Sequence, residues 1–383
     1  MEPGRLNLRH LEAFAAIVRL GSVSAAAAAA NLTQPAITQG LGRLEAQLSV
    51  ALFDRHSSGM AATPAALGFL PRVEAALGQV ASRRVTMAQL TAFVAVARGG
   101  SYVSASGATG LAQPSLHRAV RDLSLALGRS LVERRGRGLV LTAAGLRTAR
   151  GFRLALAELT AGLAEIGALQ GLAAGRIAIG AMPLARARLL PAIVAAYHRE
   201  RPGVEIIIAE GSHAELIEPL RDGDLDLLIG ALRDPGPGPD VVQTPLFDDR
   251  PVIIGRAAHP LAHAPHDFAH MAEYEWIMPA RVTPLRAMWE AMFTREGVAP
   301  PRVPVECGSV ITIRGLLLDS DCLTLLSPDQ VAVELAAGLL ATIGPPPGGM
   351  VRTIGLTARS GWIPTPDQRA FIDRAIAMAA QTS

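Results

Sequence analysis

The chain carries one sequence pattern twice, at a fixed offset of 79 residues. Asn31 to Leu48 reads NLTQPAITQGLGRLEAQL, and Gly110 to Leu127 reads GLAQPSLHRAVRDLSLAL. Without a gap, the same offset relates further identical residues, including Leu11 and Leu90, Phe14 and Phe93, Gly21 and Gly100, Leu44 and Leu123, and Thr63 and Thr142. Because the matches include Gly, Gln, Pro and Phe, alanine-rich composition does not explain them. The pattern therefore predicts a duplicated unit that folds twice.

Length and composition limit what surrounds this unit. Half of the 383 residues are hydrophobic, so the chain can form two to four domains with large cores. Neither a run of 18 apolar residues nor a hydrophobic segment behind a basic start is present, so we expect a cytoplasmic protein without a membrane span. The two cysteines, Cys307 and Cys322, are too few for a disulfide scaffold or a four-cysteine zinc site.

Positive charge is concentrated in one segment. Residues 83–153 hold twelve arginines and two carboxylates, whereas residues 1–82 hold six arginines and five carboxylates. Since the whole chain has a net charge of only +3, the remainder is acidic. An Arg placed near a phosphate releases condensed counterions, so a basic block in such a chain favours nucleic-acid binding. A solvated basic surface is the alternative.

Each copy of the pattern predicts three short helices followed by a hairpin. In the second copy, residues 87–98 form an apolar-faced helix that a Gly pair ends, and residues 101–110 form a short second helix. In the third helix, residues 113–127, the apolar side chains Leu116, Val120, Leu123 and Leu127 share one face. Ser115, His117, Arg118 and Arg121 then face outward, as in a helix that enters a major groove with its N-terminal residues at base edges.

Residues 133–142 predict a Gly-turned hairpin after the third helix. It would carry Arg134, Arg135 and Arg137 toward the DNA backbone or the minor groove.

The second copy, with QPSLHR at 113–118 and LTAAG at 141–145, resembles the winged helix-turn-helix of LysR-type transcriptional regulators, and the first copy resembles the same motif. Members of this family normally carry one such domain, so the tandem copy is a departure. The resemblance implies a DNA-binding regulator that is not an enzyme, with double-stranded DNA and RNA polymerase as partners, and with no metal and no cofactor beyond a small effector. The DNA contacts that it implies are Gln113, Ser115, His117, Arg118, Arg121, Arg134, Arg135 and Arg137 in the second copy, and Gln34, Thr38, Gln39 and Arg43 in the first.

The first copy departs from the motif in its third helix. Gly40 and Gly42 stand inside this helix, each costing about 1 kcal/mol relative to Ala. Ala66 stands where the motif has Gly. The first copy can therefore serve either DNA binding or packing and dimerisation.

A heptad seam follows the second hairpin. Its apolar positions alternate in steps of four and three residues, namely Phe152, Leu156, Leu159, Leu163 and Ile166. The seam resembles the linker helix that dimerises the family's DNA-binding domains, which implies a homodimer or a dimer of dimers. Packing against its own chain is the alternative. The first copy ends in a similar seam, which we expect Pro71 to interrupt.

From residue 175 on, strands alternate with helices, which predicts a parallel α/β sheet, and a second such series opens near Val252. The phrases RPGVEI, LRDGDLDLLIG and HPLA resemble the family's effector-binding domain. The fold class we expect is mixed, with two all-α winged helix-turn-helix domains (1–82 and 83–145), a linker helix (146–174) and an α/β effector domain (175–383). That domain would consist of two subdomains of the type II periplasmic-binding-protein kind.

Ligands of open α/β sheets lie beyond the carboxyl ends of strands. That rule gives Met182, Ser212, Thr283 and Ser309 as candidate effector contacts, together with Leu184, which stands where relatives often have Ser or Thr. For Ser212 and Ser309, helix capping is the alternative, and Glu215 completes a capping box with Ser212.

Other classes of protein find little support. An exported solute-binding protein would need an export signal, and it would have no use for helix-turn-helix repeats. An enzyme or metal site would have to use the histidines at 259, 263, 266 and 270, but Pro260 and Pro265 break that run, so we expect solvated loop histidines. A redox-sensing cysteine pair is also conceivable, although the apolar surroundings of Cys307 and Cys322 favour inert buried thiols.

Overall fold

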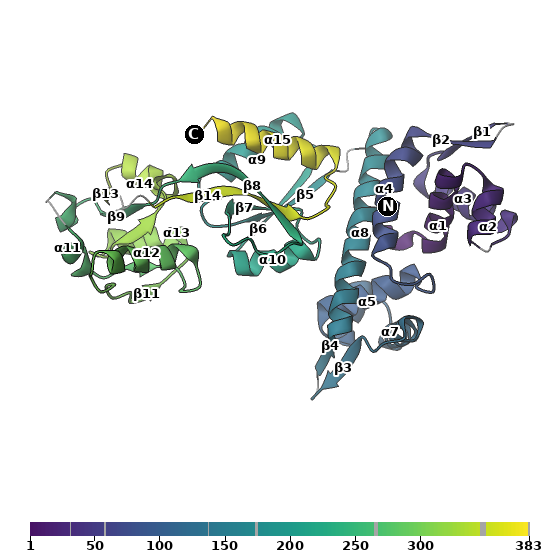
Figure 1. Ribbon diagram of the computed structural model, residues 1–383, viewed down its shortest axis with the longest axis horizontal. Coiled ribbons are helices and arrows are strands. Elements are labelled where there is room, and N and C mark those ends of the chain that lie inside the picture. The colour runs from purple at the N-terminus through teal and green to yellow at the C-terminus, as the bar shows by residue number, and fades with distance from the viewer. Residues whose placement is uncertain are drawn as a thin grey trace.

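The computed structural model describes residues 1–30, 32–56, 59–136, 138–172, 175–263, 267–344 and 350–381. Two small helical units lie along one side of a long helix, α8, and an α/β region lies on its other side (Figure 1). Among the described helices, none is long and apolar enough to cross a lipid bilayer.

The two helical units have the same elements in the same order. After a 3-10 turn (Pro3–Arg5), the first unit comprises α1 (Leu8–Leu20), α2 (Val23–Ala30), α3 (Gln34–Leu48), the hairpin β1 (Phe53–His56) and β2 (Gly59–Ala62), and α4 (Pro64–Gly78). The second comprises α5 (Met87–Gly99), α6 (Tyr102–Thr109), α7 (Gln113–Leu127), the hairpin β3 (Val132–Arg135) and β4 (Gly138–Leu141), and α8 (Ala143–Leu169). Every first residue of an element in one unit lies 79 positions from its counterpart, so the sequence offset is also the structural offset.

Local signals explain where the helices of the second unit begin and end. Thr86 and Gln89 form a capping box at the start of α5, and Gly100 ends that helix in the left-handed conformation with φ 62°. Gly128, with φ 64°, ends α7 in the same way. Along α7, Leu116, Val120 and Leu123 are buried, which confirms the predicted apolar face.

The seam of α8 packs against α4 of the same chain. Phe152, Leu159 and Ile166 are buried, and an added Cβ on Gly162 would lie 2.7 Å from the ring of Phe69 in α4. The expected dimerisation seam therefore has a partner inside its own chain. α8 begins at Ala143, three residues before the expected start of the linker helix. The expected interruption of α4 at Pro71 is wrong, because the helix continues through this residue.

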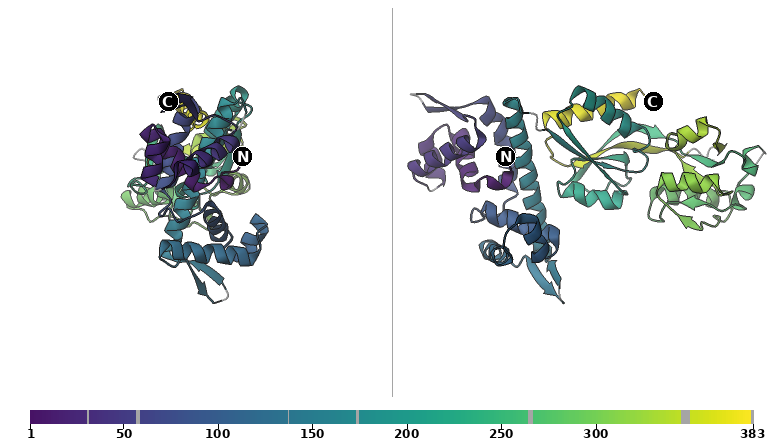
Figure 2. Two further views of the ribbon diagram at one scale, coloured as in Figure 1. Left: turned by 90° about the vertical axis from the view of Figure 1, so that its right-hand side faces the viewer. Right: turned by 180° about the vertical axis from the view of Figure 1, so that it is seen from behind.

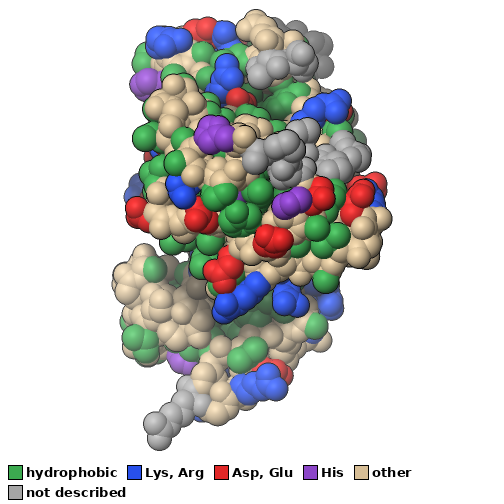
Figure 3. Space-filling model, turned by 90° about the vertical axis from the view of Figure 1, so that its left-hand side faces the viewer, with side chains coloured by type: hydrophobic (Ala, Val, Ile, Leu, Met, Phe, Trp, Pro, Cys, Tyr) green, Lys and Arg blue, Asp and Glu red, His purple; other side chains and the backbone are tan. Residues whose placement is uncertain are grey.

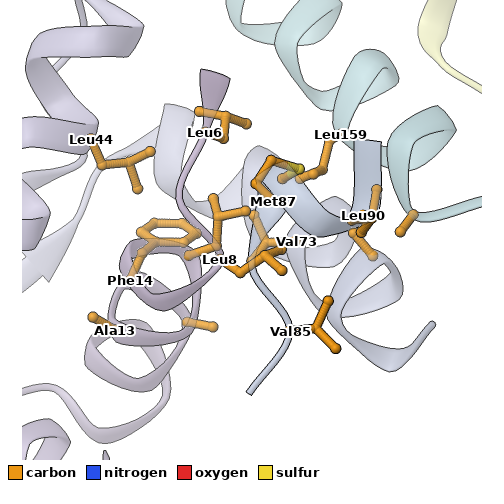
Figure 4. Packing of buried hydrophobic residues seen from close by; sticks show 14 of the residues in the cluster. Leu6, Leu8, Ala13, Phe14, Leu44, Val73, Val85, Met87, Leu90 and Leu159 are labelled. Atoms are coloured by element: carbon orange, nitrogen blue, oxygen red, sulfur yellow. The ribbon is translucent and has the colours of Figure 1, made fainter. Parts of the chain in front are cut away.

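One hydrophobic core joins both units and the α4–α8 pair. Leu8 and Leu44 of the first unit belong to the same buried cluster as Met87 and Leu90 of the second and Leu159 of α8 (Figure 4). The boundary drawn at residues 82 and 83 thus separates two copies of a motif but not two cores.

The first α/β subdomain is built on a five-stranded mixed sheet with the strand order β6-β5-β7-β14-β8. The expected parallel arrangement holds for β5 (Arg176–Ala181), β6 (Glu205–Glu210) and β7 (Leu227–Ala231). It fails for β14 (Arg352–Arg359), which runs antiparallel to both β7 and β8 (Val241–Asp249). The helices of this subdomain are α9 (Leu189–Glu200), α10 (His213–Arg221) and α15 (Pro366–Ala380).

The second subdomain lies between β8 and β14 in the sequence. Its central sheet, β12-β9-β13, is antiparallel and is formed by β9 (Val252–Arg256), β12 (Thr324–Leu326) and β13 (Leu340–Gly344). A parallel pair, β10 (Ile277–Met278) and β11 (Val305–Glu306), joins β12 through a bridge between Trp276 and Leu323. Its helical segments are the 3-10 turns Pro260–Ala262 and Pro328–Val331, and α11 (Phe268–Ala272), α12 (Pro284–Arg295), α13 (Val310–Leu318) and α14 (Ala332–Ala336). Because the chain returns through β14, the first subdomain is discontinuous in sequence.

The two glycines of α3 differ in their surroundings, which yields a stability prediction. An added Cβ at Gly42 meets no atom within 4 Å, whereas one at Gly40 would lie 3.0 Å from the imidazole of His10. Replacing Gly42 with Ala should raise the free energy of unfolding by about 0.5–1 kcal/mol, because Ala restricts the unfolded backbone.

Gly40→Ala serves as the matched control, since the same helix gains the same methyl group against a crowded imidazole. Urea titrations of both variants measure the effect. An equal gain in both variants would contradict the packing described here.

Candidate nucleic-acid interface and effector site

The outward face of α7 gathers the side chains expected to contact DNA. Gln113, Ser115, His117, Arg118 and Arg121 are all exposed on it, opposite the buried leucines. A concave surface of about 700 Å³ runs along this face. Among the described residues, Arg121 pairs only with its neighbour Asp122, at 3.3 Å, so its guanidinium stays at the surface.

Tyr102 of α6 supports this face. Its ring stacks on the imidazole of His117, with ring centroids 3.5 Å apart. Burial raises the pKa of Tyr102, while the charge of Arg134 in β3 lowers it, which shows that the hairpin acts on the same face. Arg134 and Arg135 are exposed, whereas the predicted contact Arg137 lies outside the described residues.

The first unit presents a different chemistry on α3. Gln34, Thr38, Gln39 and Arg43 are exposed, as predicted for residues that reach bases. At the positions of Arg118 and Arg121, however, this helix has Gln39 and Gly42. It offers hydrogen-bonding groups where α7 offers positive charge.

Part of the basic block faces the α/β region instead of solvent. Arg98 of α5 pairs with Asp224, and Arg150 of α8 pairs with Glu218 and, at 2.9 Å, with Asp222. Arg153 also reaches Asp222, at 3.0 Å. Acidic and basic side chains accordingly lie close together across the middle of the face in Figure 3. Arg118 on α7 and Arg134 and Arg135 on the hairpin stay exposed, without an ion-pair partner among the described residues.

The candidate effector residues of the first subdomain lie at neighbouring strand ends. The Gly211 N–H donates to the Ala181 carbonyl, so the segments after β5 and β6 start side by side. Met182 is buried against Gly230 and belongs to the core, so its side chain does not line a cleft. Leu184 is half-buried in the turn before α9.

The three candidate hydroxyls are all helix caps. Ser212 forms the predicted capping box with Glu215 at α10, which confirms that box. Thr283 accepts from the Arg286 N–H at α12, and Ser309 accepts from the Thr312 N–H at α13. Thr283 and Ser309 follow the paired strands β10 and β11, so the structure brings them to one edge of the second subdomain.

Two residues that the sequence analysis missed lie beside Ser212. His213, the first residue of α10, has a buried Nε2 with no hydrogen-bond partner among the described residues. Burial, together with the smaller effect of the charges of Arg233 and Arg221, lowers the pKa of His213 to about 4. Arg233 follows β7, and burial lowers its pKa as well. The capping signal at Ser212 pointed to this place, but only the folded sheet brings the charge of Arg233 close enough to act on His213.

The histidines and cysteines considered above as metal or redox sites can now be placed in the fold. His259 is fully buried, so the expectation of a solvated histidine is wrong there, and its Nδ1 accepts from the Leu261 N–H. His266 lies outside the described residues, and among those described no group of three potential metal ligands occurs.

Cys307 follows β11 and Cys322 precedes β12, with β10 between them, and both thiols are half-buried. Two strand spacings alone separate them by at least about 10 Å, beyond the reach of a disulfide.

His213 makes stability depend on pH. Its folded pKa of about 4 lies below the ordinary 6.5, so the unfolded chain takes up a proton first. The stability that neutral His213 contributes is therefore present above pH 6.5 and is lost as the pH falls toward 4. In His213→Gln, urea titrations should show that the free energy of unfolding falls less steeply between pH 6.5 and pH 4. His198→Gln, which changes an exposed histidine of α9, should keep the wild-type dependence of the unfolding free energy on pH. A shallower dependence in this variant as well would show that the effect does not come from His213.

Comparisons with known proteins agree with this geometry. The model "LysR substrate binding domain" matches residues 170–380, and "Bacterial regulatory helix-turn-helix protein, lysR family" matches residues 8–67 and again residues 87–146. The chain is 32% identical over 373 residues to the HTH-type transcriptional regulator GalR of Pseudomonas putida, with 94% of each chain covered.

Other relatives match a smaller part of the chain. The HTH-type transcriptional regulator PcaQ of Agrobacterium fabrum is 30% identical, covering 74% of this chain and 91% of its own. The crystal structure of CbnR, a LysR family transcriptional regulator, shares the fold at a TM-score of 0.53 and 18% identity, covering 76% of this chain and 98% of its own. The whole-length match and the two family models together show that the chain belongs to the LysR family of DNA-binding transcriptional regulators.

Proposed function

We propose that this regulator contacts DNA through both of its helical units, each acting as a winged helix-turn-helix, and that α7 supplies most of the affinity. The observation that carries the proposal is the outward face of α7, where exposed Arg118 and Arg121 stand beside Gln113, Ser115 and His117. The exposed Arg134 and Arg135 of the hairpin add two cations for phosphates. The face of α3, with Arg43 as its one exposed arginine among the described residues, supports a secondary role in reading sequence.

The setting follows from the family. We propose on this ground that the protein works in the cytoplasm, has RNA polymerase as a partner and assembles as a homo-oligomer. Four segments make up the proposed architecture, with two helix-turn-helix units (1–82 and 83–145), a linker helix (146–174) and an effector-binding domain (175–383).

We further propose that the effector is a small anion held between the two subdomains. On the first subdomain, His213 and Arg233 supply positive or protonatable groups beside Ser212. On the second subdomain, Thr283 and Ser309 would supply hydroxyls from the starts of α12 and α13. An anion near His213 would favour its protonated form, so binding should be accompanied by proton uptake. Arg188 of the first subdomain pairs with Asp329 of the second at 3.1 Å, which spans the gap between them.

The DNA-binding proposal is tested on the operator found by genomic footprinting. Arg118→Ala/Arg121→Ala should weaken operator binding at least about 30-fold and reduce the salt dependence, because each lost contact costs about 1–3 kcal/mol. Gln39→Ala/Arg43→Ala should cost less. Fluorescence anisotropy at several salt concentrations measures both.

Arg199→Ala/Arg295→Ala is the matched control, since it removes the same charge from exposed sites on α9 and α12. Equal losses in the α3 and α7 variants would show that α7 does not dominate. A similar loss of operator affinity in the control would show that the effect comes from the overall charge of the protein.

The effector proposal is tested by calorimetry with a panel of small carboxylic acids. Thr283→Val and Ser309→Ala should each weaken binding about fivefold, the value of one hydrogen bond. Thr294→Val, at the other end of α12, should leave affinity unchanged, since its hydroxyl bonds the Glu290 carbonyl. Unaltered affinity in both Thr283→Val and Ser309→Ala, at unchanged melting temperature, would place the effector elsewhere.

A further inference from the structure

The pairing of α4 with α8 is antiparallel. Gln79, at the end of α4, lies beside Gly151 near the start of α8, where the Gln79 carbonyl is 3.1 Å from an added Cβ. Arg72, seven residues earlier, reaches Glu158, seven residues later, at 2.9 Å. The hairpins β1–β2 and β3–β4 accordingly lie at opposite ends of this helix pair (Figure 1).

These contacts obey a two-fold rule. In a symmetric dimer, a contact between residue i of one copy and residue j of the other implies a second contact in which the copies are exchanged. Exchanging the copies, by the 79-residue offset, turns the contact of Arg72 with Glu158 into a contact of Gln79 with Gly151. Both contacts are present.

A second pair of contacts, away from α4 and α8, follows the same rule. Glu12 of α1 lies 3.9 Å from Arg83, which precedes α5. Exchanging the copies turns this contact into one between Gly4 and Thr91, and an added Cβ on Gly4 would lie 3.2 Å from the Thr91 methyl group. The two units are therefore related by a pseudo-two-fold axis and are not merely adjacent.

We propose that one chain is an internal dimer for DNA recognition, with α3 and α7 reading two segments of a single operator. This inference rests on the proposed function and goes beyond it, because it makes the two-headed reading unit a property of one chain. Symmetric helix-turn-helix dimers place their recognition helices on half-sites about 10 base pairs apart, or a multiple of that. Here both recognition helices lie on the side of α8 that faces away from the α/β region (Figures 1 and 2).

Charges at the interface specify the pairing of α4 with α8. The buried Arg72 bonds both Glu158 and Glu165, whereas its counterpart in the second unit is Gly151. Pairing two copies of α8 would bring the region of Glu158 against Gly151 and leave the carboxylates without a cation. Pairing two copies of α4 would leave Arg72 beside Gln79. Each helix therefore selects the other and disfavours its own kind.

The two halves of the operator should differ in sequence. The arginines of α7 suit guanine, which offers two acceptors in the major groove, whereas the amide of Gln39 on α3 suits adenine. An internal dimer with unlike recognition helices reads an asymmetric site in one orientation, which a true homodimer cannot do.

The pairing is tested in the full chain with Cys307→Ser and Cys322→Ser as background. In Gln79→Cys/Gly151→Cys, the two Cβ positions lie 3.9 Å apart, which suits a disulfide. Oxidation with copper phenanthroline should give a disulfide within one chain, seen as a monomer on a non-reducing gel. Gln79→Cys/Ala46→Cys is the control that should keep its thiols. Disulfide-linked dimers would overturn the internal pairing.

A second pair of cysteines tests the same internal pairing if a cysteine at Gly151 disturbs α8. Glu12→Cys/Arg83→Cys, at an exposed contact, is joined by a short bismaleimide. Crosslinking within the chain supports the internal dimer, and crosslinking between chains overturns it.

The DNA step uses the oxidised Gln79→Cys/Gly151→Cys protein and hydroxyl-radical footprinting on the operator. The locked protein should bind with the affinity of its reduced form and protect two segments. Adding Gln39→Ala/Arg43→Ala should remove protection of one segment, and Arg118→Ala/Arg121→Ala that of the other.

The outcomes separate the two proposals. Loss of binding on oxidation, or a footprint that the α3 substitutions do not change, would overturn the internal dimer while regulation through α7 stands. Absence of any operator binding by the native protein would overturn the proposed function itself.

Discussion

The buried guanidinium of Arg72 joins three parts of the chain. It donates in bidentate fashion to Glu165 and singly to Glu158, both on α8, and at 2.6 Å to the carbonyl of Ile363 in the α/β region. A buried charge is tolerated only when its hydrogen bonds are satisfied, so this arrangement fixes α4, α8 and the segment before α15 together. The positions of α3 and α7 depend on that fixed pair, because each helical unit packs on one of its two helices.

The same geometry connects the effector edge with the DNA-binding part. Helix α10 begins at Ser212 and His213, where we propose effector contacts, and its far end carries Glu218 and Asp222. These carboxylates pair with Arg150 and Arg153 of α8. One short helix thus carries both the Ser212 cap and the carboxylates that pair with α8.

The two helical units share a framework and differ at their surfaces. Equivalent core positions are filled by Phe14 and Phe93, which contact Phe69 and Phe152 at centroid distances of 5.7 and 6.2 Å. Equivalent surface positions differ, as with Gly42 and Arg121. Because close packing constrains the interior far more than solvent constrains the exterior, the two copies can differ in what they recognise while sharing a fold.

Local sequence signals were sufficient for the elements of the helical units and for the start of α10 in the α/β region. The Gly pair after α5, the apolar spacing along α7 and the Ser212 capping box all act over a few residues, so they can be read from the chain. The same holds for the exposed face of α7, since a helix with one buried side must expose the other.

What the sequence by itself determined was the repeat, its helices and hairpins, and the alternation of strands and helices that follows. Tertiary structure alone decided that the α8 seam packs on α4, that β14 returns antiparallel to β7, that Met182 is a core residue, and that the charge of Arg233 acts on His213. The heptad spacing specifies an apolar stripe but not its partner, and strand propensity carries no direction. Contacts between residues far apart in sequence depend on how whole elements pack, and that information lies in the folded chain.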